Sequence, residues 1–437
     1  MMASVIDFGV LFSLLFGNSL DPIHVPVSLD GQVLGQLVAV TDTGVIVERL
    51  QNVFFDTLVI LFVSILVANE VVIVFVSNKV QQPLERLSGA LFKRASGDLG
   101  TYGATLGLGG RISALIGQLN VLNASLWDRA RRALEQGSRT LTSTIQISNL
   151  ADRQGVRRAS VLDARIPLFI FCFAEELQKS FLPLFVADMW QPTDWFDRSL
   201  MLGMPISLFM FVIAALTPFS GALVERFGTR RMFLYGLVPA VGGYLLCAFA
   251  GSANDILLGR GLTAVGYAII TIASQSYIAD VATRDNRAKS MAVFVGVLMT
   301  ATLCGTAVGA VLAEWVGFKV VFLISTVLAA AAGVLALITL FPKEAMQDDE
   351  APNGAKTKGS LGSFFRILLN ARFALLVIFC AIPAKVVLTG ILYLLVPLYL
   401  AELASSQSEI GRIMMLYSLI IIPISPLASR LADRFDR

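Results

Sequence analysis

The sequence is short of charge, histidine and cysteine. Charged residues make up 15% of its 437 positions, whereas a soluble domain has about 25%. The lone histidine, His24, cannot build a metal site, and the cysteines have neither zinc-like nor redox spacing. We therefore expect no metal, no cofactor and four free, buried thiols, at Cys172, Cys247, Cys304 and Cys380.

Several functional signals are also missing. The net charge of +3 is small and scattered, so it gives no footprint for nucleic acid. There is no Walker loop, zinc signature or nucleophile elbow, and the glycine-rich stretch 100–110 lacks a P-loop lysine. No cleavable signal peptide is convincing, because Asp7 interrupts the apolar run 4–16. We therefore expect neither an enzyme nor a nucleic-acid-binding protein.

Long apolar runs are what the sequence has instead. Hydrophobic residues make up 56% of the chain, and several runs reach the roughly 20 residues that a helix needs to cross a bilayer. We expect an all-α integral membrane protein. Nine spanning helices are predicted, at 54–77, 166–187, 199–220, 232–250, 256–279, 290–314, 318–341, 373–399 and 410–430.

Positive charge indicates how these helices are oriented. Residues 78–165 contain 13 Lys or Arg but only six acids, and the helix count places the hydrophilic stretch 342–372 on the same side. Because cytoplasmic loops carry an excess of Lys and Arg, both stretches are predicted to be cytoplasmic. The chain is then a multi-pass protein of the cell membrane with an extracytoplasmic N-terminus.

The N-terminal segment 1–53 contains the only strand-like stretch, at 24–52. Alternating apolar residues from Val25 to Leu29 are followed by Asp30-Gly31, a hairpin turn signal. We expect the remnant of an extracytoplasmic sensor domain, or else an uninvolved stub. In the helix that follows, Glu70 is either a functional group or an anchor near the interface, because a buried acid is costly.

The cytoplasmic segment 78–130 has two heptad-like seams, separated by a glycine-rich connector at about 97–110. A membrane helix that leads into helix, connector and helix resembles the HAMP domain. Pro83-Leu84 matches the opening proline of that family, but Arg111 stands where the family usually has a glutamate. The seams predict a parallel homodimer, and the alternative is an amphipathic spacer without a signalling role. Their residues are Val80, Leu84, Leu87 and Leu91, then Ile112, Leu115, Leu119, Leu122 and Leu126.

A charged signature occurs twice in the chain. GALVERFGTRR at 221–231 and SRLADRFDR at 429–437 share Leu, an acid, Arg and Phe at matching positions, and six predicted helices separate them. A parallel six-helix repeat of this kind resembles the major facilitator superfamily. Glutamate replaces the usual aspartate, Thr229 is inserted, and the second copy lacks both glycines. The matching residues are Gly221, Leu223, Glu225, Arg226, Gly228, Arg230 and Arg231, with Asp433 and Arg434 in the second copy.

This resemblance covers about 166–437 and implies a major-facilitator-like helical bundle. The first six-helix half is expected at 166–341, after a linker at 131–165. The second half starts at 373, after the central cytoplasmic loop. Eight of the family's twelve helices are then present, so the chain looks truncated. The resemblance also implies that the signature loop holds the two halves together when the transporter is open to the outside.

Two further patterns resemble the same family. Arg260 and Gly266 match its fourth-helix motif, which implies that Arg260 takes part in proton coupling; the alternative is an arginine that snorkels near the outer end. Gly305 and Gly309 resemble the antiporter motif, but the proline of that motif is missing. We therefore interpret all three glycines as helix-packing positions.

Charged residues inside the predicted spans are the candidates for solute or proton contact. Glu175 and Lys179 are four apart on one helix face and are predicted to pair, while Glu176 faces elsewhere. Lys385 is the nearest counterpart in the second half. The alternative is a neutralising pair that only fixes helix packing.

The sequence therefore favours a secondary transporter that moves a small solute by alternating access and is coupled to protons. The expected partners are lipid, solute and proton, together with a second copy of the chain. Glu175 or Glu176 would carry the proton and Arg260 would tune the affinity of the acid. A different class of function is also open, in which the bundle is a receptor that binds a ligand and signals through the HAMP-like segment without transport.

Overall fold

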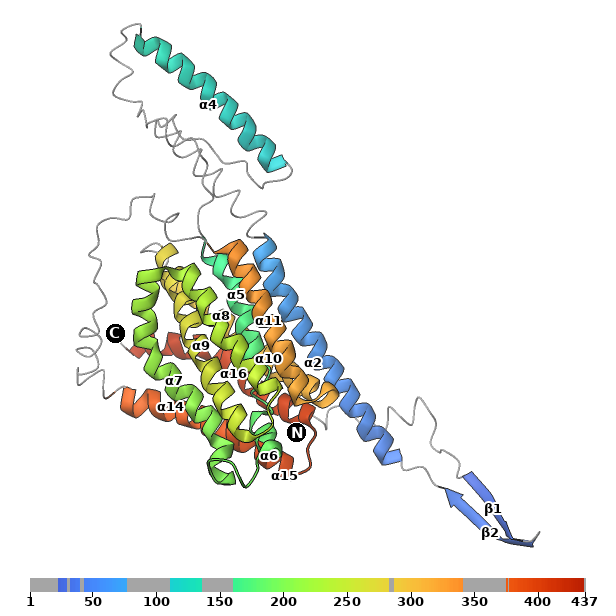
Figure 1. The fold of residues 1–437 in the computed structure, drawn as a ribbon. Helices are drawn as coiled ribbons and strands as arrows, with labels where there is room; N and C mark the ends of the chain where they lie inside the picture. Colours follow the sequence, from blue (N-terminus) through green and yellow to red (C-terminus); the bar gives the residue numbers. More distant parts are fainter. Residues whose placement is uncertain are drawn as a thin grey trace.

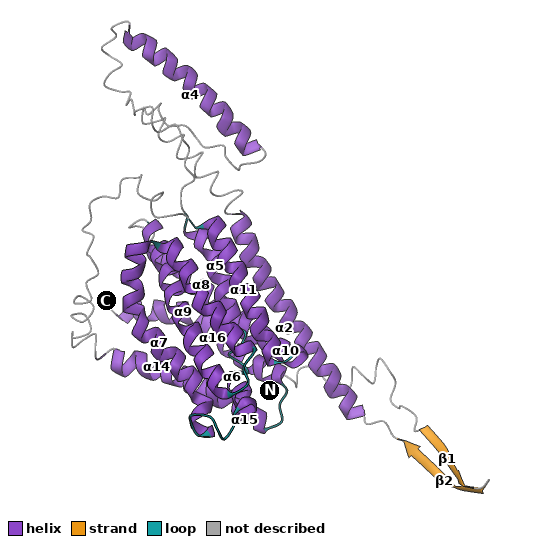
Figure 2. Ribbon diagram, viewed as in Figure 1, coloured by secondary structure: helices purple, strands orange, loops and turns teal. Residues whose placement is uncertain are grey.

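The computed structural model describes residues 23–29, 32–39, 43–76, 111–135, 160–282, 287–340, 375 and 377–435. Helices dominate this part of the chain, and β1 and β2 are its only strands (Figure 2). Seven of its helices are long and apolar enough to cross a membrane. The protein is therefore an all-α multi-pass membrane protein with a small hairpin in front.

The predicted N-terminal hairpin is confirmed. Strands β1 (Ile23–Leu29) and β2 (Gln32–Ala39) pair antiparallel. The prediction of a strand-like stretch as far as residue 52 is wrong, because α2 (Thr43–Val76) already begins at Thr43. An apolar run marks only the part of a helix that lies in lipid, whereas the helix itself continues into polar sequence.

Helix α4 (Arg111–Glu135) contains the second predicted heptad seam and extends into the predicted linker. The first seam and the glycine-rich connector lie outside the described residues, so a HAMP-like domain is not shown. Figure 1 shows β1 and β2 beyond one end of α2, and α4 beyond the opposite end of the helix bundle.

Seven helices, α5 to α11, form the first half of the bundle that Figure 1 draws. Helix α9 packs against α7 and α8, α11 packs against α8, and both α10 and α11 pack against α5. Buried phenylalanines fill the centre, with the rings of Phe181 and Phe318 stacked 4.9 Å apart. The helices are α5 (Arg165–Glu176), α6 (Leu182–Met189), α7 (Arg198–Phe227), α8 (Thr229–Ala248), α9 (Ala253–Val281), α10 (Arg287–Val316) and α11 (Phe318–Thr339), after a short turn η3 (Val161–Ala164).

The second half begins with one span, Val377–Glu402, that alternates between π-helical and α-helical turns. Its segments are η6 (Val377–Ala381), α14 (Ile382–Val386), η7 (Val387–Leu395) and α15 (Val396–Glu402). Helix α16 (Gln407–Phe435) follows and packs on α10. All four cysteines are free, but Cys380 in this span is exposed, so the prediction that every thiol is buried is wrong there.

Candidate functional site

The first helix of the bundle is broken in the middle. We predicted one helix over 166–187, but α5 ends at Glu176 and α6 starts at Leu182. Pro183 stands at the start of α6, and since proline has no backbone N–H it cannot continue the α-helical hydrogen bonding across this point. The break brings four polar residues into the bundle interior, namely Glu175, Glu176, Gln178 and Lys179.

Glu175 is paired with Arg260 rather than with Lys179. Its Oε1 lies 2.8 Å from Nη1 of Arg260, and both side chains are almost fully buried. The hydroxyl of Tyr244 donates to its Oε2 at 2.7 Å, and Nε2 of Gln178 donates to the same oxygen at 3.0 Å. The predicted Glu175–Lys179 pair is wrong because the chain leaves the α-helix after Glu176, so residues four apart no longer share a face.

Lys179 is instead paired with Glu176, at 2.5 Å between Nζ and Oε1. Its ammonium also lies over the ring of Tyr393, 4.9 Å from the ring centroid. The second carboxylate oxygen of Glu176, Oε2, is buried and has no hydrogen-bond partner among the described residues. Glu176 therefore holds its charge with fewer partners than Glu175 does.

Arg260 lies in the bundle interior. Its exposed fraction is 2%, and its guanidinium lies 4.2 Å from the centroid of the Phe209 ring. The alternative of a snorkelling arginine is therefore wrong. Removing an arginine from water is expensive unless a counter-charge is close, and Glu175 supplies that charge.

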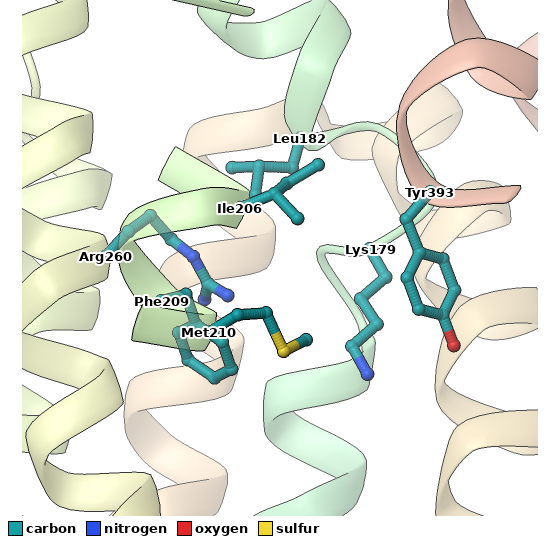
Figure 3. A pocket seen from close by; sticks show the side chains of 7 residues that line it. All are labelled: Lys179, Leu182, Ile206, Phe209, Met210, Arg260 and Tyr393. Atoms are coloured by element: carbon teal, nitrogen blue, oxygen red, sulfur yellow. The ribbon is translucent and has the colours of Figure 1, made fainter. Parts of the chain in front are cut away.

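A pocket opens between these ion pairs (Figure 3). Its cavity volume is about 20 Å³, room for about one water molecule, and the open space around it brings the total to about 290 Å³. Figure 3 shows Arg260 on one side, Lys179 and Tyr393 on the other, and Met210 between them. Glu175 and Glu176 are not among the lining residues, so the lining presents two cations and an apolar wall. Its lining consists of Lys179, Leu182, Ile206, Phe209, Met210, Arg260 and Tyr393.

The pocket is shared by both halves of the bundle. Tyr393 comes from η7, whereas the other lining residues come from the first half. Lys385 does not line the pocket; it is exposed on α14, although it is close enough for its charge to interact with Lys179 and Glu176.

Close helix contact at the break depends on two glycines of α10. A Cβ added at Gly305 would lie 2.5 Å from Cβ of Glu176, and one at Gly309 would collide with the carbonyl of Leu177. Gly266 is similarly tight, since its Cβ would lie 2.5 Å from the carbonyl oxygen of Gly236 on α8. The glycines of α10 thus let α10 lie directly against the chain that carries the acids.

The first signature segment is helical over most of its length. Its residues 221–227 extend α7, and Thr229 already begins α8, so the predicted loop is wrong. Gly228 alone makes the turn, with φ of 86° and ψ of 152°, a conformation that side chains other than glycine rarely adopt. Arg230 donates from Nη2 to the carbonyl oxygen of Leu337 at 2.8 Å.

The other signature residues are placed as follows. Arg226 stacks on the ring of Phe227 at 5.3 Å, Leu223 is exposed, and a Cβ at Gly221 would meet nothing within 4 Å. Glu225 and Arg231 both have interaction partners. The second signature lies within α16, and the side chains of Asp433 and Arg434 are outside the described ones.

Sequence reasoning missed three residues of this site. Gln178 lies between the two acids and Lys179, separated from Glu176 only by Leu177, so it could have been recognised as part of the same polar segment. Tyr244 and Tyr393 gave no signal, because aromatic residues in apolar runs are ordinary core residues. Among the described residues, no group of three or more His, Cys, Asp or Glu side chains is placed to hold a metal ion.

Fold and site together define a membrane-embedded bundle of two helical halves with buried ion pairs where the halves meet. The sequence pattern of the Major Facilitator Superfamily matches residues 168–437. The chain belongs to the Major Facilitator Superfamily.

Individual relatives are more distant. Proteins called MdtD, to which a multidrug resistance role is ascribed, are 28% identical over 151 residues in Escherichia coli (strain K12 / DH10B) and in Shigella boydii serotype 18. The match covers 35% of this chain and 32% of theirs, so the chain spans about a third of the length of the curated relatives it matches.

Solved structures of similar fold include a D-xylose-proton symporter and an auto-inhibited peptide transporter of the POT family. The symporter is 14% identical with a TM-score of 0.46, over 63% of this chain and 68% of that one. The peptide transporter is 18% identical with a TM-score of 0.40, over 59% of this chain and 51% of that one.

Proposed function

We propose that this chain is part of a secondary transporter that moves a small amphipathic anion together with a proton. The observation that carries the proposal is the pocket shared by the two halves, which is lined by Lys179 and Arg260 and by an apolar wall. Cationic groups favour an anionic solute, and the apolar lining favours an attached hydrophobic group. The multidrug resistance role ascribed to the MdtD relatives fits a solute with apolar surface.

Glu176 is the acid best suited to carry the proton. The sequence alone offered Glu175 or Glu176, and Glu175 has Arg260, Tyr244 and Gln178 to hold its charge. Glu176 has Lys179 and a second oxygen without a hydrogen-bond partner among the described residues. A carrier must pass between charged and neutral forms, so it needs an environment that holds the charge only loosely.

The geometry supports a simple coupling step. An anionic group that enters the pocket competes with Glu176 for the ammonium of Lys179. A carboxylate that loses its counter-ion inside a bundle favours the protonated form, because burial disfavours the charge. Solute and proton then occupy the site together and leave on the other side when the two halves change their relative position.

This proposal can be tested in membrane vesicles that contain the full chain, with a pH-sensitive dye inside to measure proton flux. A naphthalene sulfonate should carry protons inward, whereas the matched naphthyl trimethylammonium should not. Lys179→Gln and Glu176→Gln should abolish the proton flux. Lys319→Gln, which removes an exposed lysine at the start of α11 outside the pocket lining, is the matched control and should keep the flux.

The same vesicles separate the roles of the two acids. If Glu175 is structural, Glu175→Gln combined with Arg260→Gln should recover part of the folded protein that either single change loses, because no unpaired charge remains buried. If Glu175→Gln alone still binds the sulfonate but loses proton-driven uptake, the coupling role returns to Glu175. Flux with the cation but not the anion would overturn the proposed solute class.

A receptor is the second candidate function, and the contact of α2 with the bundle favours it. Under this proposal the segment 78–130, which resembles a HAMP domain, carries a signal to or from the bundle, and the N-terminus faces outside the cell. Saturable binding of the sulfonate without any solute flux would support the receptor over the transporter.

A further inference from the structure

Helix α2 lies against the bundle although it precedes the part of the chain that matches the superfamily, residues 168–437. Figure 1 shows it running along the side of the bundle next to α10. It contacts α5 and α10 of the first half and α16 of the second half. A helix that touches both halves can sense how they are placed relative to each other.

One face of α2 is built for this contact. Val59, Val63 and Leu66 pack towards Cys304 of α10 and Met415 of α16. These apolar positions and the acids Asp56 and Glu70 follow each other in steps of three and four residues, which places all of them on one helical stripe. Many large apolar side chains elsewhere on α2 are exposed, so the packed stripe fixes the rotation of the helix.

An ion pair fastens each end of the stripe. Near the C-terminal end, Arg165 of α5 donates to both oxygens of Glu70, from Nε at 2.6 Å and from Nη2 at 2.8 Å. Towards the other end, Arg412 of α16 donates to Asp56 at 2.9 Å and to the side chain of Asn52 at 3.0 Å. The two acids are 14 residues apart, which is about 21 Å along a helix.

The two anchors belong to different halves. Arg165 begins the first helix of the first half, and Arg412 lies in α16 of the second half. Halves that change their relative position must shift Arg412 against Arg165. A single straight helix cannot follow both, so one end of the contact has to yield in each cycle.

We propose that α2 is a clasp across the two halves, which couples the segments on either side of it to the transport cycle through the Asp56–Arg412 and Glu70–Arg165 pairs. The inference rests on the proposed function, because it assumes that the halves move. The hairpin stands before α2 in the chain and the cytoplasmic segment 78–130 stands after it, so a displacement of α2 reaches both.

Asp56→Asn is the first test. Arg412 keeps Asn52 and also Glu409, whose Oε1 lies 3.8 Å from Nη2, so the variant should still fold. Release of the clasp should raise the rate of sulfonate-driven proton flux by roughly 2- to 30-fold, the range that changes at coupling elements produce. Glu402→Gln, which removes an exposed acid elsewhere, is the matched control and should leave the rate unchanged. The exchange of Asp56→Arg with Arg412→Asp should restore the original rate.

Cross-linking tests the clasp without relying on transport. Cysteines at Asp56 and Arg412, in a chain whose own cysteines are replaced by serine, are joined by a bifunctional thiol reagent. The cross-link should stop the flux, and reduction should restore it. Addition of the sulfonate should change the rate of cross-linking. If it does so while no flux occurs, the transporter proposal fails but the clasp proposal stands. Undiminished flux in the cross-linked protein, or an Asp56→Asn protein that transports at the original rate, would overturn the clasp alone.

Discussion

The tight contact between α10 and the broken first helix gives a prediction that needs no knowledge of the solute. A Cβ at Gly305 would lie 2.5 Å from Cβ of Glu176 and 3.0 Å from the carbonyl oxygen of Phe173. Carbon atoms in contact are about 3.5–4.0 Å apart, so α10 would have to move by roughly 1 Å. At Gly309 the obstacle is the backbone of Leu177, which cannot swing aside.

The magnitude follows from two opposing effects. Overpacking costs about 1–3 kcal/mol, whereas alanine gains about 0.5–1 kcal/mol over glycine inside a helix. Gly296 lies in the same helix, and a Cβ there meets nothing within 4 Å, so Gly296→Ala shows the gain alone. Gly309→Ala should therefore be less stable than Gly296→Ala by about 1–3 kcal/mol, with Gly305→Ala between them.

Thermal unfolding of the purified protein in detergent measures this difference. For domains of 150–250 residues each kcal/mol shifts the midpoint by about 2–4 °C, so Gly309→Ala should unfold a few to about ten degrees below Gly296→Ala. If Gly309→Ala unfolds at or above the temperature of Gly296→Ala, then α10 does not lie against the break, and the geometry argued for Glu176 and Lys179 fails with it.

Three other predictions follow from particular residues. Gly228→Ala should lower the unfolding midpoint, because its positive φ costs another residue about 1–3 kcal/mol. Gly221→Ala lies inside α7 with free space around its Cβ, so it should raise the midpoint in the same melt through the helix gain of about 0.5–1 kcal/mol. Cysteines at Leu115 or Leu122, both exposed on α4, should form cross-links between two copies in native membranes. A cysteine at Ala124, on the other side of the helix, should not form them, and equal cross-linking yields would argue against the parallel dimer. Cysteines introduced within 342–372 should resist a membrane-impermeant maleimide added from outside intact cells, and labelling there would reverse the predicted topology.

The sequence was sufficient to predict that most of the helices exist, but not where they end or break. Apolar runs predicted α7 to α11, because burial in lipid demands them. The same runs missed that α2 begins 11 residues before the predicted start and that 221–227 is helical, since a helix keeps its own backbone hydrogen bonds in polar sequence as well. Pro183 was the overlooked sign of the break between α5 and α6.

The partners of the buried charges depended on that break. An interaction between residues four apart presumes an uninterrupted helix, so the pairing of Glu175 with Lys179 was a reasonable but wrong prediction. The true partner of Glu175, Arg260, lies on another helix, and no local pattern links the two. Arg260 itself was predictable as a buried functional candidate, because an arginine in an apolar run needs a partner in the interior.

Four buried acids of the membrane part differ in the cation with which each one is paired. Asp56, Glu70 and Glu175 are each paired with an arginine, whose charge is fixed, and Arg165 donates to both oxygens of Glu70. Glu176 is paired with a lysine, a point charge on a flexible stem that can leave its partner at little geometric cost. Under the proposed function, these three acids hold helices together, and Glu176 is the acid that gives up its charge. Two adjacent glutamates, in a segment interrupted directly after them, would then serve opposite purposes: Glu175 is paired with Arg260 of α9, whereas Glu176 responds to what enters the pocket.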